Sequence, residues 1–357
     1  MEGQFILQIV GITEAVITKR PSKRFPANDS IAEVYILSEN KEVLAHTPSG
    51  GCDGMADTTA SVLVAYCPDD HSASTDSAYA TASASAMKNN ITNTIVENTK
   101  HTHTVFLSIQ REITKPDGSI NSIEDQEQII GINPKIAYEL IESAIEKKLI
   151  SVLPPVKQFK RNIPMVLEGK INSCFSFVGI CDDDVPFIME VFNVPFAEYC
   201  NDKNITGTSG ADTSEAGTSA ADTSEAGTSA SEAGTSEAGT SASTADTSAS
   251  AAESEEDNYN TKIAYYPEKN SDNTLAIQRI KDLTTIKSES IIRCLLAYVI
   301  ERTDVDCFNF STHDPEYRAA VKNAIENGVD IVPLMVSWTK EGIAFFVTDK
   351  LPVVYPQ

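Results

Sequence analysis

One acidic residue, Glu190, stands inside an apolar stretch of the chain. Residues 171–180 and 185–194 are two runs rich in β-branched and aromatic residues, and this pattern predicts the two strands of a β-hairpin. A carboxylate in such a strand costs free energy unless it is paired, binds a metal ion or reaches water. An edge strand whose polar face meets water is the commoner case. A site built on Glu190, with a metal ion bound to it, is the alternative.

Three more acidic residues lie between the two predicted strands. Asp182, Asp183 and Asp184 follow Cys181 and form the predicted turn of the hairpin. Aspartate is common in turns because its side chain hydrogen-bonds to the nearby backbone. A solvated turn is therefore the simpler interpretation. Metal ligation is the alternative, although the turn lies several residues from Glu190.

A basic cluster follows the first predicted strand. It consists of Lys19, Arg20, Lys23 and Arg24, and Phe25 comes directly after it. On a small barrel, such cations suit contacts to phosphates and the aromatic ring suits stacking on a base. A solvated basic loop explains the same residues equally well. Further basic residues that could extend the patch toward the hairpin are Lys157, Lys160, Arg161 and Lys170.

The N-terminal part of the sequence predicts a small β-barrel. Short strand patterns occur at residues 5–18, 31–37, 42–45, 62–66 and 105–110. Five short strands in so few residues are typical of an OB-like barrel. We expect this barrel in residues 1–115, with a polar, disordered insertion at about 69–92.

The C-terminal part predicts an α/β domain. A helix begins at Pro134 behind the N-cap Asn133, and a second helix is expected at 275–286. An apolar strand at 291–300, a helix from Asp314 to Gly328 and a strand at 329–338 then form a βαβ unit. We expect this domain over residues 116–357, interrupted by a disordered Ser/Thr/Ala/Gly-rich insertion at 205–257.

Composition limits the function. The formal net charge is −23, and the tract 211–257 contributes 11 acidic residues and no basic one, so the rest of the chain carries −12. This charge argues against a broad nucleic-acid footprint but leaves room for a local basic groove. The seven cysteines are widely spaced and form no CxxC pair, which indicates free thiols in a reducing compartment. No membrane span or secretory signal is predicted, so we expect an intracellular protein, cytoplasmic or nuclear.

Several motifs resemble those of the SfsA (sugar fermentation stimulation) family in their order and spacing. They are Lys23-Arg24-Phe25 followed by Ala32-Glu33-Val34, HTPSGGC at 46–52, Asn98-Thr99-Lys100 with His103-Thr104, Gly131-Ile132-Asn133, residues 311–333, and Lys350-Leu351-Pro352-Val353. The resemblance implies an α+β and α/β architecture. An N-terminal OB-like β-barrel would be followed by a restriction-endonuclease-like α/β domain of the PD-(D/E)xK type. It also implies association with DNA.

The resemblance assigns residues to a nuclease centre. The family pattern RIDF falls on residues 174–177, so Ser176 stands at the aspartate position. The pattern EVK falls on residues 190–192, so Glu190 is kept and Phe192 stands at the lysine position, while an upstream glutamate falls on Gln158. A hydroxyl in place of a carboxylate weakens a Mg²⁺ site, and phenylalanine cannot activate water. The resemblance therefore implies a degenerate centre.

Three functions follow, in order of preference. The first is a DNA-binding pseudoenzyme without a cofactor, which binds through Arg20, Lys23, Arg24, Phe25, Lys157 and Lys160. The second is a metal-dependent DNA endonuclease in which Glu190 holds Mg²⁺ or Mn²⁺ with substitute ligands from Asp182–Asp184 or Glu268. The third is a non-catalytic interaction scaffold whose acidic tract recruits a protein partner.

Overall fold

Strands make up most of the regular structure in the computed structural model. It describes residues 3–48, 52–67, 102–115, 118–121, 126–167, 171–200, 261–269 and 271–356. The insertions expected at about 69–92 and at 205–257 lie outside these residues, so both remain predictions. Within the described part of the chain, no helix is long and apolar enough to cross a membrane.

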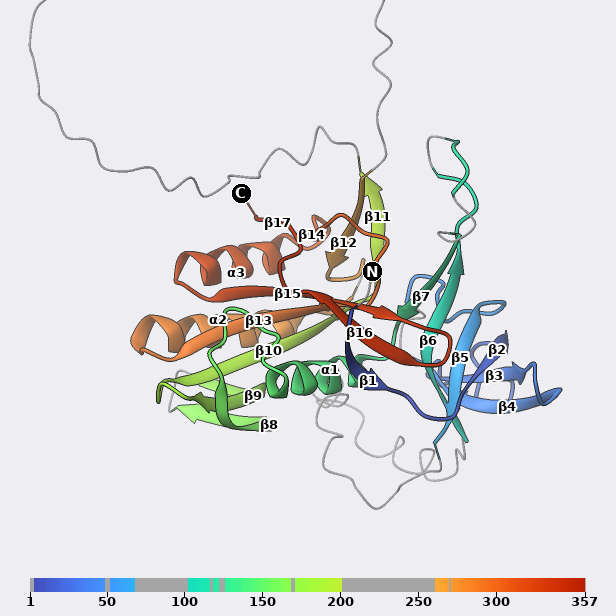
Figure 1. Cartoon of the computed structure of the whole chain (residues 1–357), viewed down its shortest axis with the longest axis horizontal. Coiled ribbons are helices and arrows are strands. Elements are labelled where there is room, and N and C mark those ends of the chain that lie inside the picture. The colour runs from blue at the N-terminus through green and yellow to red at the C-terminus, as the bar shows by residue number, and fades with distance from the viewer. Residues whose placement is uncertain are drawn as a thin grey trace, which may run out of the picture. The chain divides into compact units, whose positions relative to one another are not determined.

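A seven-stranded sheet carries the predicted hairpin (Figure 1). In order across the sheet its strands are β1 (Gln4–Gln8), β16 (Ile343–Thr348), β15 (Asp330–Trp338), β13 (Arg293–Ile300), β10 (Pro186–Val194), β9 (Ile171–Cys181) and β8 (Val156–Leu167). The inner strands β10, β13 and β15 run parallel, and the outer pairs are antiparallel. The continuous apolar run in β13 fits a central strand buried on both faces.

Three helices cover the two faces of this sheet. They are α1 (Pro134–Glu146), α2 (Thr274–Glu289) and α3 (Pro315–Glu326), and α2 and α3 lie side by side (Figure 1). Met189 and Val191 of β10 pack with α1, whereas Ile188 and Phe192 pack with α2 and α3. Side chains alternate along a strand, so Glu190 faces α2 and α3.

The local predictions for this half are confirmed. Strands β9 and β10 pair antiparallel as the expected hairpin, and β13, α3 and β15 form the expected parallel βαβ unit. The Asn133 side chain accepts a hydrogen bond from the Lys135 amide at the start of α1, and Asp314 caps α3 through the Tyr317 amide. The sequence therefore specifies the helix starts through their capping residues.

The N-terminal strands form a six-stranded sheet that curls into a partial ring. Its order is β4 (Lys41–His46), β3 (Ile31–Ile36), β2 (Ile12–Lys19), β5 (Ser61–Tyr66), β6 (His103–Arg111) and β7 (Glu127–Gly131), and β4 also pairs with β6. The ring is compatible with the expected OB-like barrel. It differs from the expected limits of 1–115 at both ends.

The difference in limits has a local cause at each end. Residues 5–18, expected as one strand, are two, because the chain turns at Gly11 with φ +73°. The first piece, β1, leaves the ring and pairs with β16 of the seven-stranded sheet. At the other end β7 pairs with β6 and extends the ring beyond residue 115.

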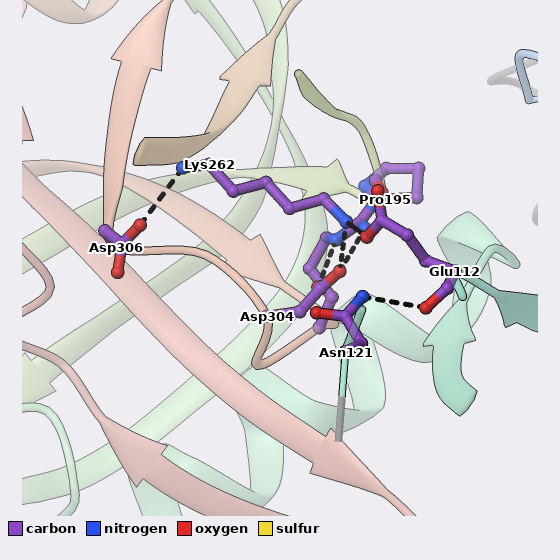
Figure 2. Close-up of polar contacts among 7 residues, drawn as sticks. Glu112, Asn121, Pro195, Lys262, Asp304 and Asp306 are labelled. Atoms are coloured by element: carbon purple, nitrogen blue, oxygen red, sulfur yellow. Dashed lines mark hydrogen bonds and ion pairs between the residues drawn. The ribbon is translucent and has the colours of Figure 1, made fainter. Parts of the chain in front are cut away.

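A third, four-stranded sheet connects to the ring through a charged network. Its strands are β11 (Ala197–Cys200), β12 (Thr261–Tyr266), β14 (Cys307–Phe310) and β17 (Val353–Val354). Figure 2 shows Lys262 of β12 reaching between Glu112, which follows β6, and Asp304, with both Nζ–O distances 2.7 Å. Burial would raise the pKa of Asp304, but the charges of Arg302 and Lys262 hold it at about 2. Asp304 is therefore ionised at neutral pH, and Lys262 joins the two sheets.

Candidate functional site

The hairpin brings Ser176 of β9 into contact with Glu190 of β10. The Ser176 amide and hydroxyl both donate to Glu190 Oε2, at 3.0 and 2.9 Å, and the Val191 amide donates to Ser176 Oγ at 3.1 Å. The regular pairing of the two strands runs only from Pro186 opposite Ile180 to Met189 opposite Phe177. Beyond it, the two side chains take over hydrogen bonds that the backbone would otherwise make.

Arg279 of α2 binds the other oxygen of the Glu190 carboxylate. Its Nη1 lies 2.6 Å from Glu190 Oε1, and the two side chains are 10% and 1% exposed. Burial raises the pKa of Glu190, and the Arg279 charge and the Ser176 hydrogen bonds oppose that rise. The pair is a buried salt bridge, which is costly to break because either partner alone would be an uncompensated buried charge.

Phe192, at the expected lysine position, lies in a cluster of aromatic side chains. Its ring centroid is 5.0 Å from that of Tyr266, 5.1 Å from that of Tyr298 and 6.2 Å from that of Tyr317. The Tyr298 and Tyr317 hydroxyls are hydrogen-bonded to each other at 2.7 Å. Aromatic packing of this kind stabilises the fold, and the Phe192 ring itself has no group that could activate water.

Gln158 lies apart from the other three assigned residues. It is exposed on β8 and pairs with Ile180 of β9, four residues along the strand from Ser176. Ser176 and Glu190 are in contact, and Phe192 lies two residues after Glu190 on the same face of β10. Nothing in the contacts of Gln158 supports the assignment of the upstream glutamate position to it.

Two of the three turn carboxylates that could substitute as metal ligands are paired with basic side chains. Asp183 receives two hydrogen bonds from the Arg293 guanidinium, at 3.0 and 2.6 Å, and the bond to Arg293 lowers the pKa of Asp183. Asp184 pairs with Lys157 at 2.6 Å, and Asp182 is exposed. These contacts favour the solvated turn.

Glu268 lines a pocket of about 570 Å³ that does not include Glu190. His313, Asp314 and Glu316 are among the other lining residues. Burial, with the nearby charge of Asp53, raises the pKa of the Glu268 carboxyl. Within the described ranges, no group of three His, Cys, Asp or Glu side chains is placed to hold a metal ion.

The residues around Glu190 do not fit a divalent cation. Mg²⁺ requires near-octahedral oxygen ligands and usually one or two free carboxylates, and a Mn²⁺ site draws on the same oxygen donors. Here one carboxylate is present, and each of its oxygens already accepts from a protein donor. A hydroxyl and an aromatic ring occupy the other two assigned positions.

The basic residues expected to contact nucleic acid have different surroundings. The Arg20 guanidinium is 5% exposed and donates to the carbonyls of Asp29, Ala56 and Pro48, so it holds the loops of the ring together. Lys23 and Arg24 are exposed, and Phe25 next to them is half-buried.

The basic residues of β8 are also accessible. Lys160 is exposed, and Lys157 is exposed while paired with Asp184. Arg161 pairs with Glu142 and packs over the Phe177 ring. Lys170 lies outside the described residues.

Sequence reasoning missed two residues of the site, Arg279 and Tyr138. Arg279 lies on the buried face of α2, which also includes Ile277, Ile280 and Leu283. A cation on such a face requires a buried partner, and that was a readable signal. Tyr138 of α1 gave no such signal; burial raises its pKa to about 12, and the charge of Glu190 adds to the rise.

Comparison with known proteins places this chain among proteins of the same fold. Residues 256–342 match the family model described as the sugar fermentation stimulation protein RE domain. The structure of Pyrococcus furiosus SfsA in complex with Ca²⁺ superposes with a TM-score of 0.57 at 13% identity, covering 98% of this chain and 99% of that chain. No curated protein matches the sequence. The matched segment contains Arg279 but not the hairpin.

Proposed function

We propose that this chain, which belongs to the SfsA family, is a DNA-binding protein whose nuclease-like centre does not cleave. The family assignment rests on the match of residues 256–342 to the sugar fermentation stimulation protein RE domain and on the SfsA-like fold. The fold offers a hairpin of the type on which nucleases of this architecture place their acidic residues. The residues that this chain carries on that hairpin therefore decide whether it can cleave DNA.

The observation that carries the proposal is the occupation of the Glu190 carboxylate. Arg279 takes Oε1, and Ser176 takes Oε2 through two donors. A metal-dependent nuclease needs carboxylate oxygens free to bind the ion that stabilises the charge on the attacked phosphate. It also gains from a cation or proton donor near the attacking water, and Phe192 supplies neither.

Contacts to DNA would come from the exposed basic residues of the ring and of β8. Lys23, Arg24 and Lys160 are exposed, and Lys157 could exchange Asp184 for a phosphate. We leave Arg20 out of this surface because its guanidinium is already bound to backbone carbonyls. A few cations on an acidic protein predict weak binding that depends steeply on salt.

Two assays on the full chain test the proposal. In the first, the affinity for a short DNA duplex and for a single strand is measured between 50 and 200 mM salt. We expect the association constant for DNA to fall steeply as the salt concentration rises. The double variant Lys23→Ala/Arg24→Ala should flatten the slope of the logarithm of this constant against the logarithm of salt concentration by about 2, since each phosphate contact contributes roughly 1. The matched control is Lys322→Ala with Lys350→Ala, which removes the same charge from exposed positions elsewhere.

The second assay asks for cleavage. The wild-type protein and a Glu190→Ala variant are incubated with DNA and with Mg²⁺ or Mn²⁺. We expect no product from either. Cleavage by the wild type that disappears in Glu190→Ala would establish the metal-dependent endonuclease instead, and the absence of salt-dependent binding would remove the DNA-binding proposal.

A further inference from the structure

A positively charged side chain lies where a nuclease-like centre would need a cation. The Arg279 guanidinium contacts Glu190 Oε1 at 2.6 Å, and Ser176 saturates the other oxygen. All three side chains are nearly or completely buried. The centre is thus a filled polar cluster and not an open site.

Helix α2 holds Arg279 in this position through a second buried polar contact. Asp282, one turn after Arg279, accepts a hydrogen bond from Ser173 Oγ at 2.5 Å and one from Gln278 at 2.7 Å. Ser173 and Ser176 belong to the same strand, β9. The helix is therefore tied to the strand that carries the centre, which fixes the guanidinium relative to Glu190.

The charges balance with a monovalent cation and not with a divalent one. One buried carboxylate and one guanidinium sum to zero, whereas a divalent ion beside a single carboxylate would leave an uncompensated charge in the core. A guanidinium also presents directed N–H donors to a carboxylate, which suits a buried pair. Neutrality and hydrogen bonding both favour Arg279 here.

We infer that the Arg279 guanidinium replaces a metal ion as the permanent cation of this centre, and that two substitutions would convert the centre into a divalent-cation site. Ser176→Asp supplies a second carboxylate beside Glu190, and Arg279→Ala removes the internal cation and opens space. The inference deepens the proposed function and rests on it, because a resident guanidinium explains why the centre needs no metal.

The test is a Mn²⁺ titration of the full chain followed by electron paramagnetic resonance. We expect the wild type to take up no Mn²⁺ at this centre and the variant Ser176→Asp/Arg279→Ala to bind one ion. The matched control is Ser176→Asn/Arg279→Ala, which has the same shape but no second carboxylate. The aspartate variant should bind Mn²⁺ at least ten-fold more tightly than the control.

Two results would overturn the inference directly. One is equal Mn²⁺ affinity in the two double variants, both folded. The other is Mn²⁺ uptake by the wild type that Glu190→Gln abolishes. The Mn²⁺ titration contains no DNA, so a double variant without Mn²⁺ affinity counts against the inference alone. A wild type that neither binds DNA nor takes up Mn²⁺ counts against the proposed function alone.

A thermal-unfolding comparison decides the matter if the aspartate variant does not fold. Arg279→Gln leaves Glu190 as a buried carboxylate without its counter-charge, whereas Glu190→Gln/Arg279→Gln leaves neither charge. We expect the double variant to melt at a higher temperature than Arg279→Gln alone. Equal or reversed melting temperatures would show that Arg279 is not the counter-cation of Glu190.

Discussion

At the scale of single residues, Glu301 is a second buried carboxyl group with a different environment. It is 0% exposed, and its Oε2 accepts a hydrogen bond from Trp338 Nε1 at 2.9 Å, while Oε1 is buried and has no hydrogen-bond partner among the described residues. A Cβ atom on Gly131 would collide with this carboxyl group, so the glycine makes room for it. Burial raises the pKa of Glu301 to about 8.

This raised pKa makes the stability of the fold depend on pH. Between about 4.5, the ordinary value, and about 8, the folded state binds the proton that the unfolded state has lost. The free energy of unfolding therefore falls as pH rises through that window, by about 1.4 kcal/mol per unit at most. We expect Glu301→Gln, which is neutral at every pH, to gain a few kcal/mol relative to the wild type between pH 5 and 8.

Urea unfolding at pH 5.0, 6.5 and 8.0 measures this effect. Glu326→Gln is the control, since it replaces a carboxyl group that is exposed to solvent on α3. Parallel stability curves for the wild type and Glu301→Gln would show that Glu301 is ionised in the folded protein without cost.

At the scale of elements, the sequence predicted those features that depend only on residues close together in the chain. The hairpin, the capped starts of α1 and α3, and the βαβ unit all follow from apolar periodicity and capping residues. The pairing of β1 with β16 did not follow, because it joins segments more than 330 residues apart in the chain. Strand pairing at such a distance leaves no local pattern.

The candidate site divides along the same line. Ser176, Glu190 and Phe192 could be placed together because the two strands of one hairpin carry them. Arg279 reaches the site from α2, and only its position on a buried helix face hinted at a partner. Which carboxylate it would meet depends on how the helix packs on the sheet, and sequence spacing does not determine that.

The polar contact between α2 and β9 gives a prediction for the helix as a unit. Asp282 is 3% exposed and Ser173 is 7% exposed, so Ser173→Ala leaves a buried carboxylate short of a donor. We expect a loss of about 1–3 kcal/mol in the free energy of unfolding, which chemical denaturation measures. Ser288→Ala is the matched control, because that exposed hydroxyl bonds only within its own helix. Equal stability of the two variants would mean that Asp282 does not anchor α2.

At the scale of the whole molecule, two polar arrangements join elements that are distant in the sequence. Lys262 joins the four-stranded sheet to the ring, and Arg279 joins α2 to the hairpin. Both place one cation between carboxylates or beside one, in surroundings with little water. In both, the cation and its acidic partners lie far apart in the sequence. These ion pairs therefore help to specify how the elements pack together and not the structure of any single element.

The distribution of charge over the chain leads to a prediction about DNA. The segment Gly207–Asp257 holds 11 acidic residues and no basic one, and without it the formal net charge of −23 becomes −12. Net negative charge slows the approach of a polyanion and lowers its local concentration at the surface. We therefore expect deletion of Gly207–Asp257 to raise the affinity for DNA roughly ten-fold at low salt.

A second variant separates charge from length. It keeps the segment but replaces its Asp and Glu with Asn and Gln, and it should gain as much affinity as the deletion. Since the Debye length falls from about 30 Å at 0.01 M to about 10 Å at 0.1 M salt, the gain should shrink as salt is added. If both variants bind DNA like the wild type while the deletion abolishes capture of a protein partner, the segment serves the interaction scaffold and the DNA surface works independently of it.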